Sequence, residues 1–346
     1  MRQLSLHSMF ASKSIEDATS GESLECYDLF CGCGGWSTGA VQAGHKVVFA
    51  CDNDEQALLA HAANHPNTTH RRLQLPHDAV PFPTDGRRFH CHGSPPCTQF
   101  SSMRTKRDND APDADAEAVR LVEWYLETAL SCGATSWTME QVAAPAVLKL
   151  VKRVRQNHLH RVDYDVFQLR DLGVPQTRRR LLVGSPHIIA RLRRSAMSDR
   201  RRSVRDVVAA PRGTHVRSSL RWEKKTLRAN RQPGESKYLY KLSSNPLHAC
   251  RPIDDAAPTV VTNGVLMWAG AHDSSSSTSA CLTPKECAAL QTFPPDYHLP
   301  DPARTAHRLV GNAVPPLVAK LMMTTLPPAR CTSPSLRRTA PEPVWK

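Results

Sequence analysis

The chain lacks any apolar run approaching the ~20 residues that a membrane-spanning helix needs. Its first residues contain no secretory apolar core, so export is not expected. The eleven cysteines are scattered through a chain that is not expected to be exported, which indicates reduced thiols. They also show no paired zinc-site spacing. These absences predict an intracellular protein without a membrane span or a metal, in a bacterial or viral-host cytoplasm or in a nucleus.

Acidic residues are in deficit: 32 Asp and Glu stand against 45 Lys and Arg, a formal net charge of +13. Such an excess favours a polyanionic partner, with nucleic acid first and an anionic membrane surface second. A length of 346 residues allows one large domain with an insertion, or two domains.

Strand, loop and helix patterns alternate from Glu25 onward. A short strand at Cys26–Phe30 precedes a glycine loop, then come a helix at Trp36–Ala43 and a second strand at Lys46–Cys51. This alternation predicts an α/β fold whose doubly wound, mostly parallel sheet carries helices on both faces.

The composition changes along the chain and divides it into segments. Residues 25–187 are expected to form the main domain, and residues 259–326 to return to it. Between them, residues 188–258 are rich in arginine and lysine with weak hydrophobic periodicity, which predicts a smaller inserted basic region. Residues 1–24 and 327–346 are expected to be a disordered and a flexible tail.

Cys97 follows two prolines at the end of the expected strand Phe89–Gly93. A rigid loop at a strand end can hold a thiol out into a cleft, where it can act as a nucleophile. A half-buried structural thiol is the commoner role of a cysteine and is the alternative.

The glycine loop Cys31–Gly35 and the acid Asp52 form a second candidate site. Glycines let a ligand approach the backbone at a helix N-terminus, and an acid that ends the next strand can bind ribose hydroxyls. Together they imply an adenosine-containing cofactor. A tight turn with a helix cap is the alternative.

Glu140 closes another strand and could act as an acid. Strand alternation predicts that Gln176, Arg178 and Arg180 share one face, suited to a base carbonyl, a phosphate or a pair with Glu140. Asn312 precedes the last helix and could bind a ligand or only cap that helix.

In this order, the motifs resemble those of the cytosine-5 DNA methyltransferases over Tyr27 to Leu326. The segments that carry the resemblance are Asp28–Gly35, Pro96–Ser101, Glu140–Val142, Gln176–Arg180, Leu282–Pro294 and Gly311–Pro316. The resemblance implies a class I, Rossmann-like enzyme that uses S-adenosylmethionine to methylate a flipped cytosine in double-stranded DNA, as a monomer on the DNA. By analogy, the inserted basic region is the target recognition region.

The resemblance also implies roles for particular residues. Those expected to be catalytic are Cys97, Glu140, Arg178 and Arg180. Those expected to bind the cofactor are Phe30, Gly32, Gly34, Gly35, Asp52, Asn53, Asp78, Asn312 and Val314. Those expected to contact nucleic acid are Ser101, Gln176, Arg200, Arg201, Arg202, Lys224, Lys225 and Arg228.

The chain departs from the family pattern at two places. Gln141, one methylene longer, replaces an Asn that fixes the catalytic loop, and Asn53 stands where an apolar residue often packs on the adenine. Two other functions stay open at this point: an RNA (tRNA) cytosine-5 methyltransferase on the same scaffold, and a catalytically degenerate DNA-binding relative.

Overall fold

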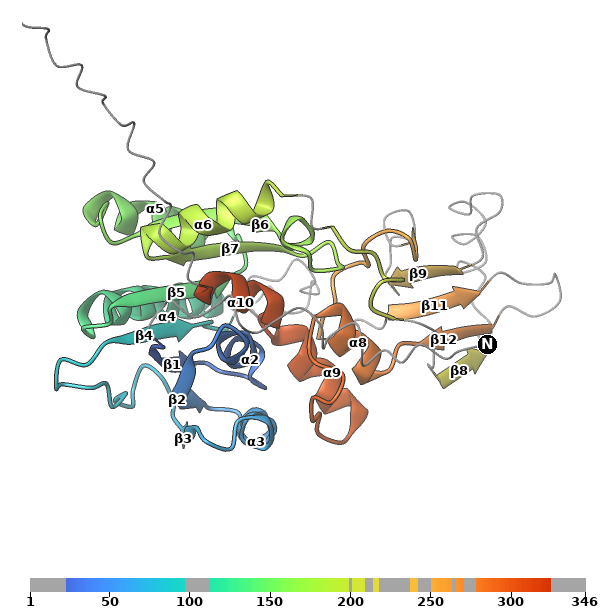
Figure 1. The fold of residues 1–346 in the computed structure, drawn as a ribbon, viewed down its shortest axis with the longest axis horizontal. Helices are drawn as coiled ribbons and strands as arrows, with labels where there is room; N and C mark the ends of the chain where they lie inside the picture. The colour runs from blue at the N-terminus through green and yellow to red at the C-terminus, as the bar shows by residue number, and fades with distance from the viewer. Residues whose placement is uncertain are drawn as a thin grey trace, which may run out of the picture. The chain divides into compact units, whose positions relative to one another are not determined.

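The structure is a computed structural model that describes residues 23–96, 112–198, 201–208, 214–217, 237–241, 250–262, 266–270 and 278–324. Figure 1 shows its helices and its strands, and the strands form two sheets. Both sheets lie within the compact unit Ser23–Met323.

The first sheet has seven strands in the order β3-β2-β1-β4-β5-β7-β6. They are β1 (Glu25–Leu29), β2 (Lys46–Asp52), β3 (Thr69–Arg72), β4 (Phe89–Gly93), β5 (Ser136–Gln141), β6 (Asp163–Gln168) and β7 (Arg179–Gly184). Neighbours from β3 to β5 are parallel, and β7 runs antiparallel to both β5 and β6. This order confirms the expected doubly wound, mostly parallel sheet.

The helices are α2 (Gly35–Gln42), α3 (Glu55–Asn64), α4 (Pro112–Ser131), α5 (Pro145–Asn157), η4 (Leu169–Leu172), α6 (Pro186–Ala196), α8 (Pro284–Leu290), α9 (Ala303–Asn312) and α10 (Pro316–Met323). Local chemistry sets several of their starts. The Asp54 carboxylate accepts hydrogen bonds from two backbone N–H groups at the start of α3, and Thr283 and Glu286 form a capping box on α8.

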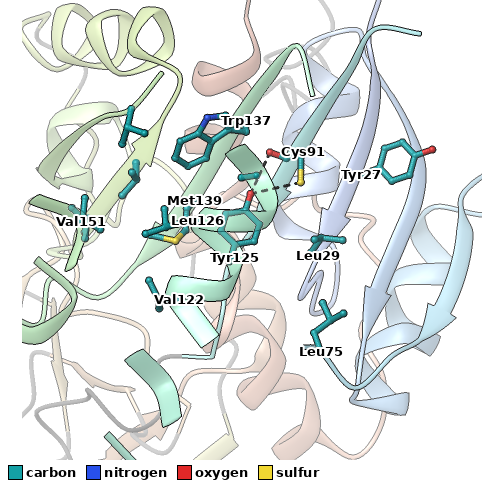
Figure 2. Packing of buried hydrophobic residues seen from close by; sticks show 14 of the residues in the cluster. Tyr27, Leu29, Leu75, Cys91, Val122, Tyr125, Leu126, Trp137, Met139 and Val151 are labelled. Atoms are coloured by element: carbon teal, nitrogen blue, oxygen red, sulfur yellow. Dashed lines mark hydrogen bonds between the residues drawn. The ribbon is translucent and has the colours of Figure 1, made fainter. Parts of the chain in front are cut away.

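One face of the first sheet is covered by α4 and α5. Figure 2 shows this core, in which Val122, Tyr125 and Leu126 of α4 pack against Trp137 and Met139 of β5. The Tyr125 hydroxyl donates to the Thr138 carbonyl oxygen at 2.7 Å, so the one polar group of this ring is satisfied inside the core.

The opposite face is covered by α2, α6 and α10, whose buried side chains form one cluster. Ile188, Ile189 and Leu192 of α6 belong to it, so α6 packs on the first sheet. The inserted region therefore begins later than position 188. The arginines that suggested a boundary there lie on an amphipathic helix. They are so numerous that the apolar stripe of this helix was not recognised in the sequence.

The second sheet is antiparallel, with five strands in the order β10-β9-β11-β12-β8. They are β8 (Thr214–Arg217), β9 (Lys237–Lys241), β10 (Cys250–Pro252), β11 (Leu266–Gly270) and β12 (Thr278–Cys281). This sheet continues past the expected boundary at 258, because β11 and β12 return to it. Between β10 and β11, residues 253–260 pack with α8 and α9, where Ile253, Ala257 and Val260 share a cluster with Leu290 and Val310.

No helix among the described residues is long and apolar enough to cross a membrane.

Candidate active site and cofactor loop

The glycine loop joins β1 to α2 at the edge where the parallel strands end. Phe30, Gly32 and Gly34 adopt positive φ angles of 58°, 54° and 92°. A Cβ added to Gly32 would meet nothing within 4 Å, so open space adjoins this backbone. A glycine with positive φ beside open space is what a loop needs to receive a ligand.

Gly34 and Gly35 serve a different purpose from Gly32. A Cβ on Gly34 would lie 2.8 Å from the Tyr297 hydroxyl, and one on Gly35 would lie 2.2 Å from the Val314 carbonyl oxygen. Both glycines therefore allow close packing of the loop against segments far along the chain. This packing is a reason for glycine at these two positions in addition to the expected ligand contact.

Asp52 ties this loop to the next strand. Its carboxylate oxygens accept backbone hydrogen bonds from Gly32 and Asp54, each at 2.9 Å. Burial raises the pKa of Asp52, and the N–H donors oppose that shift. Each carboxylate oxygen has a further lone pair, so the group can still accept a ligand hydroxyl.

Asn53 and Asp78 lie around the neighbouring residue Gln74. The Asn53 amide donates to the Gln74 side chain at 3.2 Å, and Asp78 accepts the Gln74 backbone N–H at 2.6 Å. Asp78 therefore closes its own turn with one oxygen. Asn312 is exposed as the last residue of α9, while Val314 is buried against Gly35.

Glu140 and Arg180 face each other across β5 and β7. Arg180 Nε lies 2.8 Å from Glu140 Oε1, and both side chains are largely buried. Neither atom makes a hydrogen bond within the described part of the chain, so the contact between them is an ion pair. The structure thus brings together two of the expected catalytic residues.

Gln141 holds the segment that leads to Cys97. Its Nε2 donates to the Pro95 carbonyl oxygen at 3.0 Å, and its Oε1 accepts the Val142 N–H at 2.7 Å. The side chain is fully buried. The departure at this position therefore keeps a loop-fixing contact, and it places the end of β5 beside the Pro95–Pro96 segment.

Arg178 and Gln176 do not lie where strand alternation predicted. Both precede β7 and are buried, with exposures of 1% and 0%. The Arg178 guanidinium donates to the carbonyl oxygens of Val260, Gly311 and Ala313, and Gln176 bonds to Leu290 and Gln291. These bonds correct both assignments: Arg178 is not available to a base, nor Gln176 to DNA.

A buried polar network behind the glycine loop Cys31–Gly35, the candidate cofactor loop, had not been expected. Ser37 donates to Asp28 at 2.6 Å, His61 lies 3.0 Å from Ser37, and His70 lies 2.8 Å from His61. Burial raises the pKa of Asp28 to about 7 and lowers that of His61. The four-residue spacing of His61 in α3 and His65, the residue that follows this helix, was the sequence signal for it, and the centroids of these two rings lie 4.6 Å apart.

Several expected nucleic-acid contacts can be placed. Arg201 pairs with Asp171, its Nη2 lying 3.0 Å from Oδ1, so its charge is already partly balanced. Arg202 is half-buried and has no ion pair among the described residues. The pKa of the nearby Asp206 is lowered by hydrogen bonds from Ser203 and, to a smaller extent, by Arg202. Cys97, Ser101, Arg200, Lys224, Lys225 and Arg228 lie outside the described residues.

Within the described ranges, no group of three or more His, Cys, Asp or Glu side chains could hold a metal ion. The His90 and His92 rings instead stack on Trp36, with centroids 5.4 and 4.5 Å away, on the face opposite Cys91.

The strand order is that of the class I methyltransferase fold. Solved structures share it: a putative DNA modification methyltransferase from an Escherichia coli prophage (TM-score 0.55, 18% identity, 87% of this chain and 98% of that one) and Schizosaccharomyces pombe Dnmt2 methyltransferase (TM-score 0.58, 14% identity, 88% and 98%).

The family model for C-5 cytosine-specific DNA methylase matches residues 24–327. The chain belongs to this family, and it is an enzyme of DNA cytosine-5 methylation. Among curated proteins it is similar to the type II methyltransferase M.HgiDI of Herpetosiphon aurantiacus, with 25% identity over 88% of this chain and 94% of that protein. It is also similar to M.HindV of Haemophilus influenzae, with 25% identity over 88% and 96%.

Proposed function

We propose that this chain transfers a methyl group from S-adenosylmethionine to C5 of a cytosine in double-stranded DNA, with Cys97 as covalent nucleophile, acting as a monomer on the DNA. One observation carries the proposal: the buried Glu140–Arg180 ion pair lies at the same strand end where Gln141 anchors the Pro95–Pro96 segment. Cys97 is the next residue along this chain.

The cofactor loop fits S-adenosylmethionine. Open space adjoins Gly32, and the Asp52 carboxylate that holds this loop can also accept the ribose hydroxyls. Phe30, Asn53, Asp78, Asn312 and Val314 remain proposed neighbours of the cofactor. When bound, S-adenosylmethionine supplies an electrophilic methyl group.

The residues of the chain then divide the chemistry. The Cys97 thiolate attacks C6 of the ring, an S–C6 bond forms, and the electron pair of the C5–C6 double bond makes C5 nucleophilic. Glu140 shares a proton with N3 and Arg180 holds O2, so the developing negative charge is stabilised. C5 then bonds to the methyl carbon as the S–CH3 bond of the cofactor breaks, which leaves the cofactor as a neutral thioether. A base removes the C5 proton, the double bond re-forms and the Cys97 thiolate leaves.

The ring atoms involved cannot be reached inside a duplex, so the cytosine is flipped out of the stack. Phosphate contacts come from the basic residues of the inserted region, for which Arg200, Arg202, Lys224, Lys225 and Arg228 are the proposed set, with Ser101 near the flipped base. Arg201 contributes less because Asp171 already pairs with it.

The test is transfer of labelled methyl groups from S-adenosylmethionine to duplex DNA and, separately, to tRNA. We expect labelling of DNA, located at cytosine C5 by bisulfite sequencing. Labelling of tRNA alone would show that the substrate is RNA and not DNA. Labelling of neither nucleic acid would indicate a catalytically degenerate relative.

The nucleophile is tested with a duplex that contains 5-fluorocytosine, which cannot release a C5 proton and so retains the S–C6 bond. We expect a covalent adduct through Cys97 in the wild type and none in Cys97→Ser, whose cofactor binding persists. An adduct on a different cysteine would show that Cys97 is a structural thiol.

A further inference from the structure

Three buried polar side chains meet where the segment before β7 contacts the C-terminal ends of α8 and α9. They are Gln176, Arg178 and Gln291, exposed by 0%, 1% and 0%, and we call them the polar clamp. Polar groups are costly to bury unless they are hydrogen-bonded, so the contacts of these three side chains show what the clamp holds.

Gln176 and Gln291 bond to each other and to three other segments. Gln176 Nε2 donates to Gln291 Oε1 at 2.8 Å and to the Leu290 carbonyl oxygen at 2.9 Å. Gln176 Oε1 accepts the Val260 N–H at 3.0 Å. Gln291 Nε2 donates to the Val310 carbonyl oxygen at 2.7 Å. The two glutamines therefore fasten the end of α8, the end of α9 and residue 260 to one point.

Arg178 completes the clamp at the C-terminal end of α9. Its Nη1 donates to the carbonyl oxygens of Val260 at 3.0 Å and Gly311 at 3.2 Å, and its Nη2 to those of Gly311 at 3.2 Å and Ala313 at 3.3 Å. The last carbonyls of a helix have no partner within it and carry partial negative charge, so a guanidinium is favourable there.

Each segment held by the clamp leads to a working part of the molecule. Two residues after Arg178, Arg180 forms the ion pair with Glu140. Beyond Ala313, the Val314 carbonyl oxygen packs against Gly35 at the start of α2, next to the cofactor loop. Residue 260 lies on the connection between β10 and β11 of the second sheet.

We propose that the polar clamp positions the reaction: it fixes the Glu140–Arg180 pair and the cofactor loop against the connection from which the second sheet extends. The inference rests on the proposed function, because it assigns to that site the residues that hold its parts in register. Gln176, Arg178 and Gln291 are positioning residues that touch neither substrate nor cofactor.

A positioning role predicts a loss of rate without a matching loss of binding. A displacement of about 1 Å at a reacting centre costs on the order of a hundredfold in rate. We therefore expect loosening of the clamp to slow single-turnover methyl transfer per active site by about ten- to a hundredfold, while the Kd for duplex DNA changes less than threefold.

Two variants of the full chain loosen the clamp. Arg178→Lys keeps the charge but loses the planar fork that reaches three carbonyls, and Gln291→Met keeps the approximate shape but loses the amide. Arg191→Lys is the matched control, because Arg191 is a buried arginine that donates to the Met322 carbonyl oxygen at 2.8 Å, outside the clamp. The active fraction of each protein is counted by trapping on the 5-fluorocytosine duplex.

We expect all three variants to lower Tm, and only the two clamp variants to slow transfer per active site. Should Arg178→Lys fail to fold, Gln291→Met decides alone. Wild-type rates per active site in the clamp variants would make the clamp merely structural, and a loss confined to DNA affinity would make it a docking device. An inert wild type would overturn the proposed function and this inference with it, whereas an active wild type with equally active variants overturns the inference alone.

Discussion

At the scale of single residues, the reach of Gln141 matters most. Its amide spans from the end of β5 to the Pro95 carbonyl oxygen at 3.0 Å. Asn is shorter by one C–C bond, about 1.5 Å, so it cannot reach this oxygen unless the backbone moves. The family's usual side chain is thus not interchangeable with the one present here.

We predict that Gln141→Asn slows single-turnover methyl transfer by about tenfold or more, because the segment that carries Cys97 shifts by a fraction of the missing length. Gln156→Asn, the same shortening on the exposed face of α5, serves as the control and leaves the rate unchanged. An Gln141→Asn enzyme as fast as the wild type would show that the Pro95 contact does not set the reaction geometry.

At the scale of elements, glycine has two different roles at the ends of α2: it allows a positive φ angle, or it allows close packing against another segment. Gly32 and Gly44 both have positive φ and open space around a built Cβ, whereas a Cβ on Gly35 would lie 2.2 Å from a backbone oxygen of the last motif. Strain at positive φ costs roughly 1–2 kcal/mol, and backbone overlap costs more because the segment itself must move.

We therefore predict that Gly35→Ala lowers Tm more than Gly32→Ala or Gly44→Ala does. Gly32→Ala weakens S-adenosylmethionine binding measured by calorimetry, because its methyl group enters the space beside the loop. Gly44→Ala, with equal strain at a different turn, keeps wild-type affinity. Equal affinity in all three proteins would move the cofactor away from Gly32.

The histidines behind the loop make stability depend on pH. Burial lowers the pKa of His65 to about 4, below its unfolded value of about 6.5. Between these values the unfolded chain binds the extra proton, so stability falls on acidification by about 1.4 kcal/mol per pH unit for such a group. Burial raises the pKa of Asp28 to about 7, which acts in the opposite direction. Burial lowers the pKa values of His61, His90 and His92, however, as it lowers that of His65.

We predict that Tm falls as pH is lowered from 7 to 5, and that His65→Gln makes this fall shallower. Thermal unfolding of both proteins across that range checks the prediction. Parallel curves for wild type and variant would mean that His65 titrates alike in the folded and unfolded chains.

The sequence predicted the first sheet well because its strands are short buried runs set between amphipathic helices, as in β1 and β2. It failed at Arg178 and Gln176, where period-two alternation was applied to residues that precede β7. Their hydrogen-bond partners are backbone groups more than eighty positions away. No local pattern encodes such partners. Likewise, α6 was assigned to the basic region because its arginines outweighed its apolar stripe.

At the scale of the whole molecule, the charge excess is less available to DNA than the sequence suggests. Several arginines from position 193 to 251 are paired with carboxylates: Arg193 with Asp163 and Asp165, Arg201 with Asp171, Arg205 with Asp254 and Arg251 with Asp255. A paired guanidinium attracts fewer counterions, so its contact with a phosphate releases fewer of them.

Arg202 and Arg205 allow this distinction to be measured, because they are near neighbours of equal charge. Among the residues that the structure describes, Arg205 has an ion pair, with Asp254, and Arg202 has none. We predict that Arg202→Gln weakens binding to every duplex alike and reduces the slope of log Kd against log salt by about 0.9, the value for one phosphate contact. Arg205→Gln changes the slope little, since Asp254 already balances the charge that it removes. Titrations of one duplex at several salt concentrations decide between these two expectations.

If both variants lower the slope equally, phosphate competes successfully with Asp254 for Arg205. The net charge, rather than the pairing of each arginine, then sets the affinity. If Arg202→Gln instead alters which cytosine is methylated and leaves the slope intact, Arg202 reads a base.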